Sequence, residues 1–558
     1  MMEPPMFAPW EQVFQTLELA FLVFAYLEVG DITQLLSTCK AIFYSAAASR
    51  WKHTTSALPL LRLLPCAEIE TLRGLYSYPR NKGRNFTFQS PLLDSDFQRF
   101  NIYATYITRL DLWQAPDIPV TISGWKTLLD YVNSGHVLLP NLVTLSIESQ
   151  DNRRGMLPYP WIAAFAHPSL RHLYIGRSMV VSQYVGCAIL DHVTRLCPDL
   201  AALELHIVHE GMEEQDELVL PKLDTIRIDW VGEFFRAARC LESLATSSYV
   251  FDVYLHHISQ LPLLRRLEVY HHGIQEKLAA CLPEDRFPSL RELQLSWFEM
   301  SETESLWSMS PLVKNITTLE VFRTTYVDPD SESIPVYRSP EGLLSTLLSG
   351  CPKLTVLRLE FAEGRGVMRM DKPTLRLLSQ YPLRELTFRK TDSELWIRDR
   401  PLEFISSLFP ELEVFQWQKL NVPFEELHHT LKMPKLKHLA VLVELRRIST
   451  AVLRGLPWPS NIPKNTKLEI FESMPGYLNA GSWFRTMSYL SYLWPNMRLV
   501  ARNECFAHGG GLHCNAEQVE LGNAYVELLR RRGRGNRREK AEMWASVGGP
   551  PVKWDLEF

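Results

Sequence analysis

Two cysteines and two histidines lie within ten residues near the C-terminal end of the sequence, as Cys505, His508, His513 and Cys514. Thiolate and imidazole groups are the ligands that zinc prefers, so these residues could hold a metal ion. Structural zinc ligands usually come in pairs two to four residues apart, and adjacent His513 and Cys514 would strain a tetrahedral site unless the glycines at 509–511 turn the chain sharply. We therefore predict no metal and no cofactor.

A basic run, Arg530 to Lys540, follows an amphipathic segment that spans Val519 to Leu529. Such a run is typical of a nuclear localisation signal or of a patch that contacts RNA. It lacks interleaved aromatic residues, which also fits a solvated tail. An RNA-associated function through this tail stays open as an alternative, and it would require binding that weakens steeply with added salt.

Other residue patterns that carry chemistry are missing from the sequence. It contains no Gly-rich phosphate-binding loop, no nucleophile elbow and no carboxylate pair in a catalytic context. The histidine pairs at 271–272 and 428–429 are typical of a protein surface or a helix face. The formal net charge of −4 over 558 residues favours neither nucleic acid nor a membrane as partner. We predict a protein that is not an enzyme.

The cellular compartment can be predicted from the N-terminal residues and the cysteines. The apolar stretch from Leu19 to Leu27 is far shorter than the ~20 residues that span a bilayer, and no Lys or Arg precedes Lys40. The nine cysteines are an odd, scattered set, which fits a reducing compartment. An intracellular location, in the cytoplasm or the nucleus, is expected.

A recurring motif identifies the elements that make up most of the chain. A proline precedes a strand-like pattern, Pro-x-Leu-x-x-apolar-x-apolar, at nine places: Pro140, Pro168, Pro198, Pro221, Pro262, Pro288, Pro352, Pro410 and Pro434. Related copies without this exact spacing occur at Ile107, Ile316 and Leu383, and the repeat markers lie 23 to 41 residues apart. A unit of roughly 20 to 45 residues is typical of a solenoid.

Each repeat combines a short strand with a helix-like segment. The apolar residues alternate in the strand part, whereas segments such as 185–196 and 402–408 have helical periodicity. This order predicts an α/β leucine-rich-repeat solenoid with parallel strands on the concave side and helices on the convex side. The long intervals at 223–264 and 316–354 would hold loop insertions or an unrecognised repeat.

Residues 11 to about 54 follow a different pattern. They read as three helices, with a break at Gly30, which suits the end of the first helix, and with Asp31 capping the second. The distinctive positions of this segment are Leu17, Leu19, Phe24, Tyr26, Leu27, Asp31, Leu35, Leu36, Cys39, Lys40, Phe43 and Trp51. At these positions the segment resembles an F-box, the module that docks a substrate receptor onto the Skp adaptor of SCF-type ubiquitin ligases. The family's usual Pro after the first Leu is absent, and Phe43 replaces a Trp.

The resemblance, together with the repeats and the stretch from Asp94 to Leu112, extends to the F-box/leucine-rich-repeat proteins of fungal type. It implies a non-catalytic subunit of an SCF-type ligase whose partners are a Skp-type adaptor, the cullin ligase core and an unknown protein target. The implied adaptor-binding residues are Leu17, Leu19, Phe24, Tyr26, Leu27, Leu35, Leu36, Phe43 and Trp51. The alternative is an interaction scaffold in which the N-terminal helices only cap the solenoid.

Strand alternation also predicts the residues of the concave face, where the acids outnumber the arginines. That balance does not favour a phosphate backbone and fits a protein or peptide partner better. The candidate target-binding residues are Tyr174, His206, Arg227, Asp229, Arg266, Glu268, Tyr270, Glu292, Phe322, Arg358, Glu360 and Arg389.

The expected domain organisation has five parts. A flexible N-terminus covers residues 1–10, the F-box-like helical domain covers 11–54, and a helical linker covers 55–100. The solenoid, with about twelve irregular repeats, occupies 101–475. A C-terminal helical cap and the basic tail complete the chain at 476–558.

Overall fold

The computed structural model describes residues 17–24, 26–38, 40–65, 67–72, 83–88, 92–114, 120–149, 158–208, 230–271, 282–296, 306–307, 309–323, 344–345, 348–361, 372–389, 400–443, 467–473, 480–501, 523–524 and 526–527. The chain divides into two compact units. Unit 1 comprises residues 1–276 and 285–290, and unit 2 comprises residues 277–284 and 291–558.

The described part of unit 1 begins with three helices, α2 (Leu17–Phe24), α3 (Val29–Leu35) and α4 (Lys40–Trp51). They enclose a small core formed by Ala20, Phe24, Ile32, Ile42 and Ala46. The second helix begins earlier than the sequence predicts, so Gly30 lies inside α3. Asp31 caps this helix from its third position, where its carboxylate accepts the backbone N–H of Glu28 at 3.2 Å.

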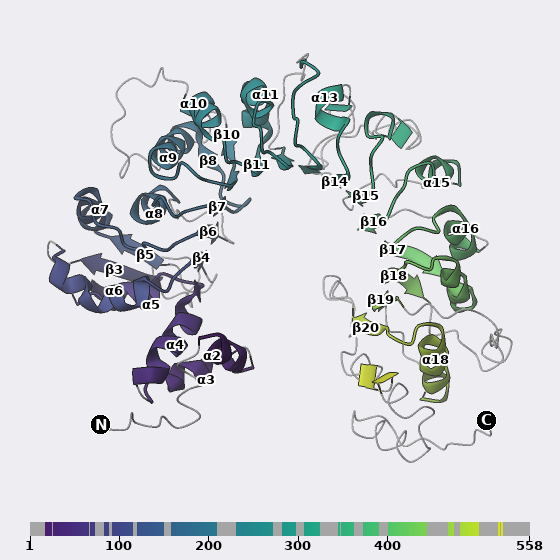
Figure 1. The fold of residues 1–558 in the computed structure, drawn as a ribbon, viewed down its shortest axis with the longest axis horizontal. Helices are drawn as coiled ribbons and strands as arrows, with labels where there is room; N and C mark the ends of the chain where they lie inside the picture. Colours follow the sequence, from purple (N-terminus) through teal and green to yellow (C-terminus); the bar gives the residue numbers. More distant parts are fainter. Residues whose placement is uncertain are drawn as a thin grey trace, which may run out of the picture. The chain divides into compact units, whose positions relative to one another are not determined.

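The repeats of unit 1 form a parallel sheet. Its strands follow one another in the order β1 (His53–Thr54), β4 (Arg109–Gln114), β6 (Thr144–Ser149), β7 (His172–Ile175), β9 (Ala202–Leu205), β11 (Ser243–Ser247) and β12 (Arg266–Tyr270). Helices lie on one side of the strands (Figure 1): α6 (Gln98–Ala104), α7 (Trp125–Asn133), α8 (Pro158–Phe165), α9 (Gln183–Leu196), α10 (Trp230–Ala237) and α11 (Ser248–Ile258).

Unit 2 repeats this design. Its parallel strands are β13 (Glu292–Ser296), β14 (Thr318–Arg323), β15 (Val356–Phe361), β16 (Glu385–Arg389), β17 (Val414–Val422), β18 (His438–Val443), β19 (Ile470–Ser473) and β20 (Arg498–Ala501). The helical elements are α13 (Ser310–Val313), α15 (Lys372–Leu378), α16 (Pro401–Leu408), the 3-10 helix η2 (Phe424–Lys432) and α18 (Ala480–Leu493). The predicted α/β leucine-rich-repeat solenoid is confirmed.

The proline of the motif occupies a defined turn between helix and strand. The N–H of Leu142 donates to the carbonyl of Leu139 at 3.2 Å, which places Pro140 second in a four-residue turn. Proline suits this position because its ring fixes φ near −65°. Leu354 and Cys351 repeat the contact around Pro352, also at 3.2 Å. The marker leucines that follow are fully buried, so the motif fixes both the turn and the core of each repeat.

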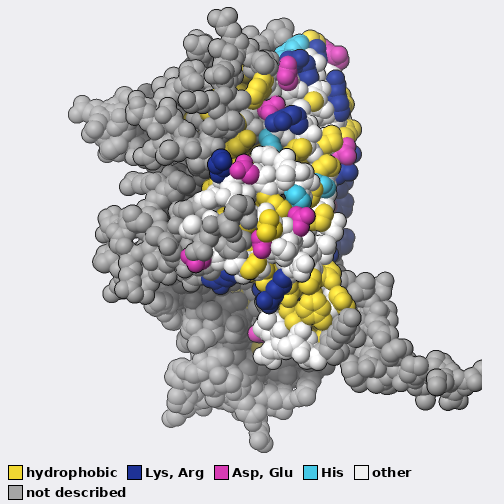
Figure 2. Space-filling view, turned by 90° about the vertical axis from the view of Figure 1, so that its left-hand side faces the viewer, with side chains coloured by type: hydrophobic (Ala, Val, Ile, Leu, Met, Phe, Trp, Pro, Cys, Tyr) yellow, Lys and Arg dark blue, Asp and Glu magenta, His cyan; other side chains and the backbone are white. Residues whose placement is uncertain are grey.

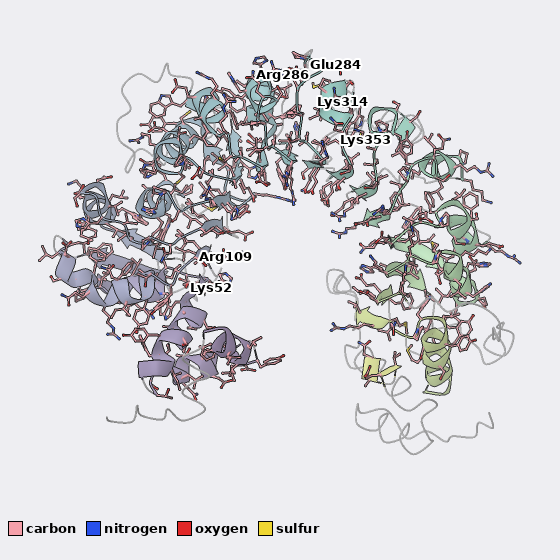
Figure 3. All side chains as sticks on the ribbon, in the orientation of Figure 1. Lys52, Arg109, Glu284, Arg286, Lys314 and Lys353 are labelled. Carbon is pink, nitrogen blue, oxygen red and sulfur yellow. The ribbon has the colours of Figure 1, made fainter. Side chains whose placement is uncertain are left out.

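Neighbouring repeats are joined at the start of each strand by one carbonyl that accepts two consecutive N–H groups. Val143 and Thr144 donate to Thr108, at 2.8 and 3.0 Å, and the same arrangement recurs along both units. The first acceptor is the carbonyl of Lys52, which receives the N–H groups of Thr108 and Arg109. Lys52 and Arg109 are labelled in Figure 3. The N-terminal helices are therefore bonded directly into the array.

Three regions differ from the elements that the sequence predicts. The stretch 55–100 is only partly helical, because β2 (Ala67–Leu72) and β3 (Gly83–Phe88) form an antiparallel pair that β5 (Val120–Ser123) extends. The long interval before Leu264 contains an unrecognised repeat, β11, which lacks the proline. The parallel strands also continue past residue 475, through β19 and β20. The copy at Pro221 lies outside the described residues.

Candidate interaction surfaces

The helix α2 and the turn after it expose a row of large apolar side chains. Leu19, Leu22, Val23 and Tyr26 are 44%, 62%, 38% and 90% exposed. Their spacing, i, i+3, i+4 and i+7, places them on one face of a helix, whereas Ala20 and Phe24 on the other face are buried in the small core. We call Leu19, Leu22, Val23 and Tyr26 the α2 face.

The structure separates the predicted adaptor-binding residues into two groups. Leu19 and Tyr26 are exposed on the α2 face, while Phe24 is buried and Leu27, Leu35 and Leu36 pack against the core beneath it. Leu22 and Val23 belong to the face but were not selected from the sequence. Their i+3 and i+4 spacing from Leu19 is the signal that would have identified them.

Phe43 and Trp51, also predicted to bind the adaptor, take part in the joint between the helices and the solenoid. The ring centroid of Tyr103, on α6, lies 4.9 Å from that of Trp51 and 6.1 Å from that of Phe43. Aromatic contacts of this kind stabilise the packing of two elements beyond the area that they bury. These two side chains thus support the orientation of α4 on the array.

Figure 2 shows one side of the described surface, on which side chains of both charges are mixed and hydrophobic side chains gather in the lower part.

The second candidate surface is the strand face, which we define as the strand side chains that point away from the helices. Strand alternation is clear in β7, where Leu173 and Ile175 are fully buried and His172 and Tyr174 are half-buried. The register aligns these side chains in rows that cross the strands.

One row in unit 1 contains Asp111, Ser146, Tyr174, Glu204, Ala245 and Glu268. At its first position, the Asp111 carboxylate accepts two bonds from Nε of Arg109, at 3.0 and 3.1 Å, and lies 2.6 Å from Nε2 of His53. The side chain of Asp111 is 18% exposed, against 55% for Arg109. One recessed acid is thus shared by two cationic groups when His53 is protonated.

The other end of this row has the same arrangement. Nη2 of Arg177 lies 2.5 Å from Oε1 of Glu268, and Nη2 of Arg266 lies 3.7 Å from its other oxygen. The Glu268 side chain is only 6% exposed, and this burial raises the pKa of its carboxyl group while Arg177 opposes the rise. The Arg177 guanidinium also covers the ring of Tyr270, at 5.5 Å from its centroid.

Two of the predicted strand-face residues are therefore not exposed. Glu268 lies beneath the arginines, and His206 is completely buried, with its ring 5.4 Å from that of Tyr270. Alternation predicts which way these side chains point but not that long neighbours cover them. Of the other predicted residues, Arg266, Glu292 and Arg389 are exposed, and Tyr174, Tyr270, Phe322, Arg358 and Glu360 are half-buried. Arg227 and Asp229 lie outside the described residues.

The strand face of unit 2 contains the reverse arrangement. Arg358 on β15 lies between Glu320 on β14 and Glu385 on β16. Its Nε and Nη2 donate to the two oxygens of Glu385 at 2.5 and 3.0 Å, and its Nη1 donates to Glu320. The bond to Glu385 and the charge of both acids raise the pKa of Arg358. One cation is thus shared by two acids.

The other candidates for chemistry are the clustered cysteines and histidines, the basic run and the buried thiols. Cys505, His508, His513, Cys514 and the basic run 530–540 lie outside the described residues. Within the described ranges, no group of three His, Cys, Asp or Glu side chains could hold a metal ion. The thiols of Cys197 and Cys351 are buried, which raises their pKa to about 11 and about 12 and makes them poor nucleophiles. No helix in the described part of the chain is long and apolar enough to cross a membrane.

Comparison with known proteins gives only distant similarities. The sequence matches no protein-family model and no curated protein. Among solved structures, the chain is similar to the complex of Rad7 and Elc1 in yeast, with 12% identity, a TM-score of 0.33, and coverage of 69% of this chain and 79% of that chain. It is also similar to an internalin from Listeria monocytogenes, with 11% identity, a TM-score of 0.27, and coverage of 71% and 87%.

Proposed function

We propose that this protein is the substrate-recognition subunit of an SCF-type ubiquitin ligase. In this proposal the N-terminal helices bind a Skp-type adaptor, which connects the chain to the cullin core, and the strand face of the repeats binds a protein target. The chain performs no bond chemistry. Its contribution is to hold the target close to a conjugating enzyme and so raise the target's effective concentration there.

The α2 face is the observation that carries the proposal. A solenoid cap needs a polar outer surface to keep the array soluble, but the outer surface of α2 is apolar. Contiguous exposed apolar side chains mark interaction sites in soluble proteins, and Leu22 and Tyr26 are 62% and 90% exposed. The resemblance of this segment to an F-box supports a Skp-type adaptor as the partner that covers the face.

Point variants on the α2 face test the proposal without disturbing the fold. Leu22→Asp combined with Tyr26→Asp introduces charge at two exposed positions, so the small core formed by Phe24 and its neighbours is preserved. The wild-type chain is expected to co-purify with a Skp adaptor, and the double variant is expected to lose it. Val253→Asp is the matched control, because Val253 is 55% exposed on α11 and lies away from this face in the sequence.

Retention of the adaptor by the double variant, or no adaptor complex with the wild-type chain, would contradict the proposal and favour the scaffold alternative. Deletion of residues 1–54 separates the two hypotheses less well. It also removes β1, which pairs with β4, and the Lys52 carbonyl that accepts the Thr108 and Arg109 N–H groups. Both hypotheses therefore predict a damaged array after this deletion.

A further inference from the structure

The strand face of unit 1 presents its cations to solvent and keeps its acids recessed. The side chains of Arg109, Arg177 and Arg266 are 55%, 45% and 49% exposed. The acids paired with them, Asp111 and Glu268, are 18% and 6% exposed. A partner that approaches this face therefore meets guanidinium groups before it meets carboxylates.

Arg109 and Arg266 both act on Tyr174, and Arg177 meets Arg266 at the carboxylate of Glu268. Burial raises the pKa of the Tyr174 hydroxyl and Glu204 adds to the rise, whereas Arg109 and Arg266 both oppose it. The two arginines thus act on the same phenol from opposite sides along the sheet, since β4 precedes β7 in strand order and β12 follows it. We call Arg109, Tyr174, Arg177, Arg266 and Tyr270 the arginine surface.

We propose that the arginine surface binds an extended acidic segment of the target protein, with carboxylates on the guanidinium groups and apolar side chains against the tyrosine rings. A guanidinium has five N–H donors, and the bonds from Arg109 to Asp111 are made by its Nε. The recessed acids hold the arginines in fixed positions, so that less side-chain entropy is lost when a second carboxylate binds.

The length of the surface sets the length of the segment. Arg109 and Arg266 stand at equivalent positions of β4 and β12, which are five strand spacings apart in the order β4, β6, β7, β9, β11 and β12. At about 4.8 Å per spacing this is roughly 24 Å, the length of about seven extended residues. A short acidic stretch could therefore contact both arginines at once.

A peptide fits this surface better than a nucleic acid. Phosphate backbones require densely placed Lys and Arg side chains, but here each arginine already has a carboxylate partner. Tyrosine together with arginine is the combination that is enriched in protein interfaces. The inference rests on the proposed use of the strand face for target binding, and it does not depend on the adaptor.

Fluorescence anisotropy with the full chain tests the inference. The probe is a labelled peptide of about eight Glu and Ala residues, and its comparison is the same peptide with Gln in place of Glu. We expect the acidic peptide to bind at least about tenfold more tightly than the Gln peptide, and Arg109→Gln with Arg266→Gln to remove most of that difference. Arg389→Gln, an exposed strand-face arginine of unit 2, is the matched control and should leave binding unchanged.

Three results would overturn the inference: equal binding of the two peptides, an unchanged affinity in the double variant, or tighter binding by an oligouridylate of similar charge. Circular dichroism and adaptor co-purification of the same samples separate its failure from other failures. If a folded, adaptor-bound chain does not bind the acidic peptide, the inference fails and the proposed ligase function stands. If the peptide binds but the adaptor does not, the ligase function fails and the inference stands.

Discussion

Each unit has one charged side chain on its strand face that two opposite charges share, but the sign of the shared charge differs between the units. In unit 1, the acid Glu268 is shared by Arg177 and Arg266. In unit 2, the cation Arg358 is shared by Glu320 and Glu385. In unit 2 the parallel register places Glu320 and Arg358 opposite each other on neighbouring strands. In unit 1 Arg266 lies on the same strand as Glu268, and Arg177 follows β7, three strands away in the sheet.

This difference shows which residue in each unit is structurally expensive to remove. Loss of the shared group leaves its two partners facing each other without compensation. In unit 1 the remaining groups would be arginines about half exposed to water, whereas in unit 2 they would be carboxylates only 14% and 17% exposed. Two unpaired like charges destabilise a fold more when they are recessed than when they are solvated. The stability of unit 2 should therefore depend more on its shared residue than that of unit 1 does.

The largest expected effect is that of Arg358→Ala. Removing the guanidinium leaves Glu320 and Glu385 unpaired in a mostly buried setting, and breaking such a network costs about 3 kcal/mol when the sites are largely desolvated. Hydrogen exchange of the β14–β16 amides, followed by mass spectrometry, measures the loss of local stability. The amides of β7–β12 in unit 1 serve as the internal control.

Addition of Glu385→Ala to Arg358→Ala should restore part of the protection, because only one carboxylate then remains. Lowering the pH toward the carboxyl pKa should also restore it, since protonation removes the repulsion. Unchanged exchange in the single variant would show that the shared cation does not hold these strands together, and the contrast between the units would then have no energetic meaning.

An intermediate effect is expected from acid and involves His429 of unit 2. Its side chain is 11% exposed, and burial, reinforced by the neighbouring His428, lowers the pKa of His429 to about 4. Between pH 6.5 and 4 the unfolded chain therefore binds a proton that the folded chain does not, so stability is complete above pH 6.5 and falls as the pH decreases. The loss should approach about 3 kcal/mol near pH 4.

The groups that face His429 set the conditions for this measurement. Glu403, with its oxygen 3.8 Å from Nε2, favours the charged form, while Lys432 and Arg400 disfavour it. Urea midpoints between pH 5 and 6.5 isolate the histidine from most carboxyl titrations. In His429→Gln the urea midpoint should depend less on pH over this range. If it depends on pH as strongly as in the wild-type chain, another group is responsible for the acid sensitivity.

The sequence predicts the repeat better than it predicts the charge network. The proline motif fixes a local turn and a buried leucine, so Leu142 and Leu354 could be placed from their immediate neighbours. The proline motif does not predict the repeat at β11, because Leu241 and Leu244 are present there without the proline. The sequence favours a helical linker where β2 and β3 form, although Ile69 and Leu72 lie in a strand that pairs with β3.

Exposure on the strand face depends on contacts that local patterns do not contain. Alternation directs the side chain of Glu268 away from the helices, but its burial comes from Arg177, which follows a strand three positions away in the sheet. The α2 face has the opposite mismatch, because apolar side chains are exposed there. Leu19, Leu22 and Val23 lie in a continuous apolar stretch, and the stretch itself does not indicate which side of the helix packs against α3 and α4.

The smallest expected effect is that of Glu268→Gln, which removes the shared charge of unit 1. Because burial raises the pKa of Glu268, its neutral form is the one that folding favours, and that contribution is lost as the pH rises through the folded-state pKa. At neutral pH the charged carboxylate keeps its ion pairs but bears a desolvation cost. Glutamine removes both, so local stability in β9–β12 should change by less than about 1 kcal/mol.

Hydrogen exchange of the β9–β12 amides at neutral pH measures this change under the conditions used for Arg358→Ala. The two variants remove the shared charge of each unit, so they form a matched pair. Glu268→Gln can be compared directly with Arg358→Ala by the protection from hydrogen exchange that each loses. An equal loss would mean that leaving the exposed arginines of unit 1 unpaired destabilises the fold as much as leaving the recessed acids of unit 2 unpaired. The difference in exposure between the two units would then not determine the cost of losing the shared charge.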